Sequence, residues 1–337
     1  MKKALINTLK ILLPLVAGVW LVIYFYEQLE PAQRVELFDA LRQADLRWLF
    51  ATLLLGWASH VCRAWRWRYL LSPLGHRPAF WNSYHAVMIG YFVNMLLPRA
   101  GEASRGLVLY RTDKVPFDKG FGTILAERAI DALMLVLIGA FTLVVQRERL
   151  DILKQRLAIF RGGQGEATGS GSWFWWVVLL LVITIVAVAY FLISRPHLRA
   201  RTMDLVRGFL QGLRSVFLTR EKGPFLLFTS FIWSLYLAMF WAGFFCLPET
   251  AKVGADGVFA GFIAGSIAII VVQGGIGAYP AFVALVVSMY MAEPAGGGLI
   301  RPDALAMGWL LWTVQTLMII VLGGVSLLLT ARSRNSA

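Results

Sequence analysis

The sequence contains few charged residues and few cysteines for its length. Of its 337 residues, 15% are Asp, Glu, Lys or Arg, whereas a soluble domain has about 25%. The two cysteines, Cys62 and Cys246, lie in or at the end of apolar stretches, which excludes a secreted domain built on disulfides. Because 58% of the residues are apolar, a disordered chain and a soluble enzyme with one aqueous core are excluded as well.

Nucleotide-binding and metal-binding motifs are also missing from the sequence. It has no G-x-x-x-x-G-K-[ST] phosphate loop and no H-E-x-x-H zinc helix. The four histidines are scattered and form no metal-ligand cluster. The largest hydrophilic stretch has about 30 residues, too few for a separate catalytic domain. We therefore expect no catalytic residues, no metal and no cofactor, and an enzyme that acts on soluble substrates is disfavoured.

Long apolar runs are what the sequence does have. A helix needs roughly 20 apolar residues to cross about 30 Å of hydrocarbon. Runs of this kind cover residues 5–26, 48–71, 121–145, 173–193, 225–247 and 304–329. We therefore predict an all-α, polytopic integral membrane protein with a single membrane domain over residues 1–337. The first run has no small-residue cleavage site, so we interpret it as a retained span rather than a signal peptide.

Two further apolar stretches are interrupted. Residues 80–110 are broken at 98–101, and residues 258–291 are broken at 274–277 and again at Pro280. Each stretch is either a full span followed by a short helix or a re-entrant pair of half-helices. Re-entrant hairpins place a clear excess of Lys and Arg on the cytoplasmic side, whereas eight spans give nearly equal numbers on both sides. The positive-inside rule thus favours six spans and cytoplasmic termini, with eight spans as the alternative.

The re-entrant model gives both halves of the chain the same order of elements: span, span, hairpin, span. Residues 5–145 form the first repeat and residues 173–330 the second, joined by a flexible Gly/Ser-containing linker at 146–172. Because each half has an odd number of spans, the second half would insert upside down. Inverted repeats with paired broken helices are typical of secondary transporters, whose sites lie where the half-helices meet. The alternative is a chance similarity between two kinked helices.

The first candidate site lies at the break near residue 100. Pro98 would end a half-helix and Gly101 would permit a turn, which frees backbone groups within an apolar stretch. Glu102 and Arg105 are three residues apart, so we expect them to share a helix face and to pair. An arginine beside a helix N-terminus also suits a phosphate. The alternative is a simple turn whose charges sit among the headgroups. The whole group is Asn94, Pro98, Arg99, Gly101, Glu102 and Arg105.

A second group of charges, Glu127, Arg128 and Asp131, lies inside the run at 121–145. Glu127 and Asp131 are one helical turn apart, and Arg128 can reach Asp131 at i+3. Ionisable groups this deep in an apolar run are costly and usually have a use. They predict either a site for substrate or protons, or a structural ion pair that locks two helices together.

Two weaker candidates complete the set. The run Gln273, Gly274, Gly275, Ile276, Gly277 contains glycines that allow left-handed turns and close backbone approach, with close helix packing as the alternative. Arg63, Arg66 and Trp67 belong to an alternating basic and aromatic pattern, which is typical of a lipid-headgroup anchor at the membrane interface.

Four motifs occur in a fixed order: RAWRWRYLL at 63–71, N-x-x-x-P-R-x-G-E-x-x-R at 94–105, E-R-x-x-D at 127–131 and GGIG at 274–277. Over roughly residues 10–330 this set resembles the lysylphosphatidylglycerol synthase transmembrane-region family, also called flippase-like or UPF0104 proteins. Full-length members join this region to a C-terminal aminoacyltransferase domain, which we expect to be absent here, so the resemblance does not imply synthase activity. Many relatives have a glutamate at the position of Pro280 and often a proline at that of Gln273, so a role of that glutamate would be vacant here or taken over.

The resemblance implies a flippase of the bacterial inner membrane that moves a polar or anionic phospholipid, aminoacylated or glycosylated. Arg99 and Arg105 would hold the phosphate, and the acidic residues would balance a cationic headgroup or couple to protons. The net charge of +13 fits positive-inside topology and anionic headgroups, so we expect anionic lipids as partners and no nucleic acid. A lipid-modifying enzyme or a second copy of the chain are further expected partners. The rival functions are a non-transporting scaffold for a separate lipid-modifying or glycosyl-transferring enzyme, and a membrane-embedded transferase with Glu127 or Asp131 as base.

Overall fold

The computed structural model describes residues 16, 18–20, 22–24, 26–27, 29–97, 100–146, 221–292 and 300–332. Throughout these ranges the secondary structure is helical, with no strand. Several predicted features lie outside the described residues: most of the span at 5–26, the whole span at 173–193, nearly all of the linker at 146–172, and the site residues Pro98 and Arg99.

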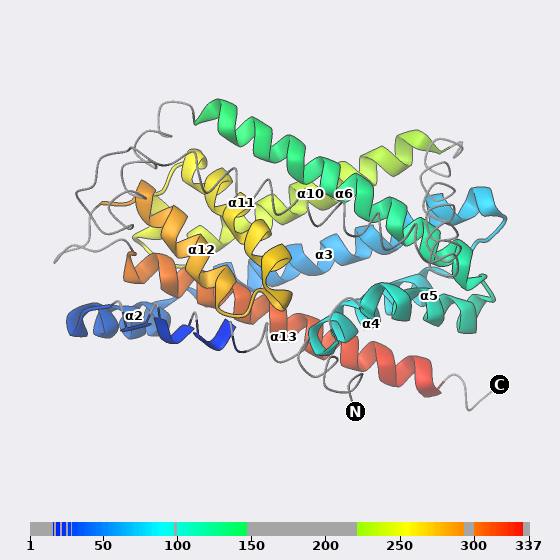
Figure 1. Cartoon of the computed structure of the whole chain (residues 1–337), viewed down its shortest axis with the longest axis horizontal. Coiled ribbons are helices and arrows are strands. Elements are labelled where there is room, and N and C mark those ends of the chain that lie inside the picture. Colours follow the sequence, from blue (N-terminus) through cyan, green and yellow to red (C-terminus); the bar gives the residue numbers. More distant parts are fainter. Residues whose placement is uncertain are drawn as a thin grey trace, which may run out of the picture.

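Figure 1 shows the order of the helices in the described residues. The first half contains α2 (Pro31–Gln43), α3 (Leu46–Leu71), η1 (Ser72–Leu74), α4 (Phe80–Leu96), α5 (Ala100–Asp113) and α6 (Phe117–Val145). The second half contains α10 (Lys222–Phe244), η3 (Thr250–Lys252), α11 (Ala255–Val271), η4 (Gln273–Gly275), α12 (Ala278–Val287), η5 (Ser288–Tyr290) and α13 (Pro302–Arg332).

Three helices of the described residues, α6, α10 and α13, are long and apolar enough to cross a membrane. They coincide with the predicted runs at 121–145, 225–247 and 304–329. Val136 on α6 is 66% exposed and Leu328 on α13 is 64% exposed, which suits helices whose outer faces meet lipid. Helix α3 has 26 residues, about 39 Å at a rise of 1.5 Å per residue, and packs along α10. The chain is an all-α, polytopic membrane protein.

Both interrupted stretches are broken, and their halves fold back as hairpins: α4 packs on α5, and α11 packs on α12. Each of these four helices is shorter than the roughly 20 residues needed to cross a bilayer, so the pairs suit re-entrant half-helices. The two hairpins lie at opposite ends of the long helices with their turns directed towards the centre (Figure 1). The turns approach each other there, because α4 contacts η4.

Glycines act differently in the two hairpins: Gly101 lies in α5 and permits close approach to α4, whereas the glycines near residue 275 form the turn itself. The backbone N–H of Gly101 donates to Asn94 Oδ1 over 2.7 Å, and a Cβ at Gly101 would collide with the carbonyl oxygen of Gly90 on α4. In the second turn Gly274, Gly275 and Gly277 have φ values of 67°, 66° and 69°, in the left-handed region that favours glycine. Both hairpins therefore depend on residues without side chains.

Pro280 does not break the second stretch as expected. It lies in the first turn of α12, which continues to Val287. The first N–H groups of a helix have no intrahelical acceptor, so a proline here loses no hydrogen bond. Gly308 on α13 accommodates it, since a Cβ at that position would lie 2.8 Å from Pro280 Cα. Pro280 is thus a packing contact between α12 and α13.

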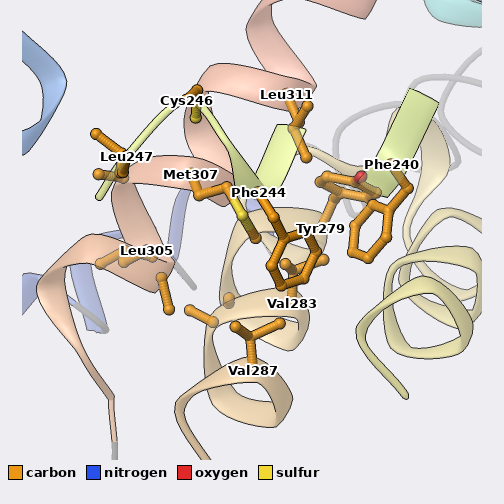
Figure 2. Close-up of a cluster of buried hydrophobic side chains, with 14 of the residues drawn as sticks. Phe240, Phe244, Cys246, Leu247, Tyr279, Val283, Val287, Leu305, Met307 and Leu311 are labelled. Carbon is orange, nitrogen blue, oxygen red and sulfur yellow. The ribbon is translucent and has the colours of Figure 1, made fainter. Parts of the chain in front are cut away.

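The largest apolar core lies where α10, α12 and α13 meet. Figure 2 shows Phe240 and Phe244 of α10 beside Val283 of α12, with Leu311 of α13 near them. Because lipid is as apolar as these side chains, such contacts stabilise a membrane fold through close packing rather than through removal from water. This core fixes the second hairpin on α13 and so positions its glycine turn.

Replacing Gly101 with alanine is expected to lower the stability by about 1–3 kcal/mol, because the new methyl group overpacks the contact with Gly90 and Asn94. The matched control is Gly324→Ala on α13, where a Cβ meets nothing within 4 Å. Thermal unfolding of both purified variants in detergent measures the difference. A Gly101→Ala melting curve that overlays the control would contradict the tight turn.

Candidate functional site

A cluster of charged side chains is buried between α3, α5 and α6. Its core members are 0–9% exposed: Arg63 and Arg66 from α3, Arg105 from α5, and Glu127 and Asp131 from α6. Charges without water must be paired, because an isolated buried charge is very costly. The cluster therefore fixes how these three helices fit together.

Asp131 is the carboxylate that holds α3 to α6. Its Oδ2 lies 2.7 Å from Arg63 Nη1 and its Oδ1 lies 2.8 Å from Arg66 Nη1. The same arginines reach α10: Arg63 donates to the Tyr236 hydroxyl over 3.0 Å, and Arg66 donates to Thr229 Oγ1 over 3.3 Å. Charge-assisted hydrogen bonds of this length are the strong ones, so one carboxylate organises three helices.

Glu127 joins the first hairpin to the same cluster. Its Oε2 lies 2.7 Å from Arg105 Nη1, and its Oε1 lies 3.6 Å from Arg66 Nε. The Arg105 guanidinium is 3.8 Å from the centroid of the Trp67 ring, a cation–π contact. The Trp67 ring is held in turn by its N–H, which donates to Thr123 Oγ1 over 2.9 Å.

The observed ion pairs differ from the two expected within single helices. Arg105 pairs with Glu127 rather than with Glu102, and Arg128 lies 3.5 Å from Glu102 rather than pairing with Asp131. The reason is burial. Arg105 lies on the buried face of α5 opposite α6, whereas the Glu102 and Arg128 side chains are 24% and 39% exposed. Pairs across helices replaced the local i,i+3 pairs.

Arg63, Arg66 and Trp67 are 2%, 0% and 0% exposed, which corrects their expected position as an anchor at the membrane interface. At 3.6 residues per turn, these residues share the inner face of α3. The outward face of the same turns carries Trp65, which is 38% exposed, with the Arg68 guanidinium 4.6 Å from its ring centroid. The aromatic and basic pattern is split between the two faces.

An amphiphilic cavity of about 950 Å³ lies beside the charge cluster. Its polar lining includes Asn94 and Glu102 from the first hairpin and Arg128 from α6. Asn94 donates to both Glu102 oxygens over 3.3 and 3.4 Å, so the turn and the acidic residue are linked. Gly274 from the second turn lines the same cavity. Both hairpin turns thus contribute to one site.

The remaining candidate residues lie around this cavity rather than in it. Gly101 is buried under Gly90, Gly275 packs against Tyr279, and Gly277 approaches the backbone of Gly18. Gln273 belongs to η4. The buried members of the charge cluster are not among the lining residues.

Several lining residues were missed at the level of sequence. His60 on α3, Tyr91 on α4, and Trp233 and Tyr236 on α10 all face the cavity. His60 could have been found, because it precedes Arg63 by three residues and so shares its helix face. The convergence of the others depends on how α3, α4 and α10 pack.

The comparisons with known proteins agree with the membrane fold. The family model of the lysylphosphatidylglycerol synthase TM region matches residues 11–324. A UPF0104 membrane protein of Methanocaldococcus jannaschii is 28% identical over 81 residues, which cover 23% of this chain and 24% of that protein. The match thus spans about a quarter of that relative's length. No solved structure matches the chain. Because the family model covers nearly the whole sequence, the chain belongs to the lysylphosphatidylglycerol synthase transmembrane-region family.

Proposed function

We propose that the protein moves anionic phospholipids between the leaflets of a bacterial inner membrane. The observation that carries this proposal is the cavity, which joins a charged pair to an apolar wall. A phospholipid has the same two parts: a phosphate that must leave water at low cost, and acyl chains that stay in hydrocarbon. The volume of about 950 Å³ falls within the usual range of ligand sites.

The apolar wall gives the cavity a mouth towards lipid. Ile269, Ile270 and Val271 at the end of α11 line the cavity and are themselves 51%, 69% and 66% exposed. Large apolar side chains exposed in this way on a membrane protein suit contact with acyl chains. A headgroup can therefore enter the cavity from the side while its chains remain in the bilayer.

Arg128 is the phosphate ligand in this proposal. Its Nε lies 3.5 Å from Glu102 Oε1, longer than the 2.7–2.9 Å of a strong charge-assisted bond, so a phosphate can replace the carboxylate. The described cluster has four guanidinium groups, of Arg63, Arg66, Arg105 and Arg128, and three carboxylates, of Glu102, Glu127 and Asp131. The one excess positive charge matches the single negative charge of a phosphodiester.

This assignment changes the roles that the sequence suggested. Arg105 is held by Glu127 and Trp67, so we give it a structural role, and the same holds for Glu127 and Asp131. The opposed hairpins, whose residues line one cavity, support an inverted repeat of residues 5–145 and 173–330, and the distribution of Lys and Arg favours cytoplasmic termini. Movement of one half against the other would open the cavity to each leaflet in turn.

Proteoliposomes that contain the full chain and fluorescent phosphatidylglycerol test the proposal. Wild-type protein should expose inner-leaflet lipid to a quencher added outside, and Arg128→Gln should slow this at least about tenfold, because a hydrogen bond to a charged group is worth about 1.5–3 kcal/mol. The control is Arg111→Gln, an exposed residue on α5 away from the cavity. Wild-type liposomes that quench no faster than empty ones would favour the scaffold function instead.

A further inference from the structure

Two residues of the cavity wall each have a ring nitrogen with no hydrogen-bond partner in the described part of the chain. These nitrogens are His60 Nδ1 and Trp233 Nε1, and both atoms are buried. The residues are 6% and 9% exposed, and both line the cavity. Buried polar atoms are nearly always paired, so these two mark a place where something other than the described residues supplies the partner.

The two nitrogens belong to a row of aromatic rings that we call the aromatic row: His60, Tyr91, Tyr236 and Trp233. The His60 and Tyr91 ring centroids are 4.7 Å apart, and those of Trp233 and Tyr236 are 6.0 Å apart. All four residues line the same cavity. Three helices, α3, α4 and α10, bring these rings together on one wall.

The aromatic row adjoins the charge cluster, because Arg63 donates to the Tyr236 hydroxyl over 3.0 Å. Arg128 lines the same cavity. A ligand whose phosphate lies at Arg128 would therefore place the rest of its headgroup within the same enclosed space. The chemistry of the row then decides which headgroups fit.

The free nitrogens favour hydroxyl groups as their partners. An indole N–H is a donor only, whereas a neutral imidazole nitrogen can donate or accept according to its tautomer. A hydroxyl both donates and accepts, so the hydroxyls of a headgroup can pair with either residue. Flat aromatic rings also pack against the C–H faces of a polyol or sugar. Phosphatidic acid, which has no group beyond the phosphate, would leave both nitrogens unpaired.

Cationic headgroups fit this wall less well. Aromatic rings do attract quaternary ammonium groups, but the adjoining cluster of described residues carries one more guanidinium than carboxylates. Glu102, the carboxylate that lines the cavity, accepts from Asn94 and lies beside Arg128. The phosphate takes up that excess charge, so an amino or choline group would have to compete with Asn94 for Glu102 and would leave both ring nitrogens unpaired.

We propose that the aromatic row binds the hydroxyl groups of an uncharged polyol or sugar headgroup, joined through its phosphate to the lipid. This inference rests on the proposed function and names its substrate class. It assigns His60 and Trp233 as specificity residues and Arg128 as the residue that holds the phosphate common to all substrates. The lipid moved is then a phosphatidyl-polyol or glycosyl phospholipid rather than an aminoacylated one.

Native mass spectrometry of the full chain in detergent tests this with phosphatidylinositol, phosphatidic acid and phosphatidylcholine as competing probes. Wild-type protein should bind phosphatidylinositol about tenfold more tightly than phosphatidic acid, as two net hydrogen bonds predict. His60→Phe and Trp233→Phe keep a ring and remove the nitrogen. Each should lower this preference about threefold, while the affinity for phosphatidic acid stays unchanged.

The control is Trp65→Phe, whose ring faces outward beside Arg68 and whose preference should equal that of wild type. Equal wild-type binding of phosphatidylinositol and phosphatidic acid, stronger binding of phosphatidylcholine, or an unchanged ratio in both variants would overturn the inference. If one of the two variants melts far below wild type, the headgroup preference of the other variant tests the inference. A protein that exposes fluorescent phosphatidylglycerol to the quencher but shows no headgroup preference would contradict only this inference. A protein that shows the preference but moves no lipid would contradict the proposed translocase function instead.

Discussion

Asp131→Asn is expected to destabilise the protein by about 3–5 kcal/mol, because it leaves the buried Arg63 and Arg66 without their carboxylate. An asparagine keeps the size of the side chain and one acceptor oxygen but removes the charge. Equilibrium unfolding of the purified variant in mixed micelles, followed by circular dichroism, measures the loss. A large drop in the yield of folded protein should accompany it.

The matched control for this variant is Asp303→Asn. Asp303 pairs with Arg301 over 3.1 Å, with side chains that are 22% and 17% exposed. A partly solvated pair of this kind contributes about 0–1 kcal/mol. If Asp131→Asn unfolds at the same denaturant concentration as Asp303→Asn, the buried cluster does not hold α3 to α6.

The ion pairs between Asp131 and its two arginines determine how the helices pack more than how stable the protein is. A buried ion pair contributes little net stability, since desolvation cancels much of the attraction, but breaking one is costly. The cluster therefore acts mainly on specificity: α3, α6 and α10 can pack in the register that pairs every charge, and other registers leave charges unpaired. This rigid wall carries Arg128 and His60 into the cavity on the same helices.

The sequence predicted three spans, α6, α10 and α13, and the two interrupted stretches, because both kinds of feature depend on local properties. Apolar length identifies a span, and a Pro or Gly cluster identifies a break. The same local reasoning misplaced Pro280, since the effect of a proline depends on whether it lies in the first turn or the interior of a helix. Pro280 lies in the first turn because α12 begins at Ala278, and its start depends on the glycine turn before it.

The predicted site residues take two kinds of position in the structure. Glu102 and Arg128 line the cavity, and Glu127 and Asp131 form the structural ion pairs that were one of two alternatives. The partners were wrong for Arg105 and Arg128, because i,i+3 spacing describes a single helix and says nothing of the neighbour across a tertiary contact. The inward position of Arg66 also depends on which face of α3 meets α6. Helical periodicity groups residues on a face but does not say which face is buried.

The second large effect is expected for Glu127→Gln, which leaves Arg105 buried with Trp67 as its remaining close partner. We expect a loss of about 3–5 kcal/mol, for the same reason as at Asp131. Adding Arg105→Met should recover most of that loss, because methionine keeps an unbranched apolar side chain over the Trp67 ring and removes the uncompensated charge. Denaturant unfolding of both single variants and the double variant closes the thermodynamic cycle and gives the coupling energy.

The same double variant separates structure from transport. If Arg105 and Glu127 serve only to dock α5 on α6, the Arg105→Met/Glu127→Gln protein should fold and still move fluorescent phosphatidylglycerol at close to the wild-type rate. Arg128 and Glu102 remain in it to receive the phosphate. A double variant that melts like wild type but moves no lipid would place Arg105 and Glu127 in the path of the headgroup. The phosphate would then be bound by the buried cluster itself, and entry would require its ion pairs to open.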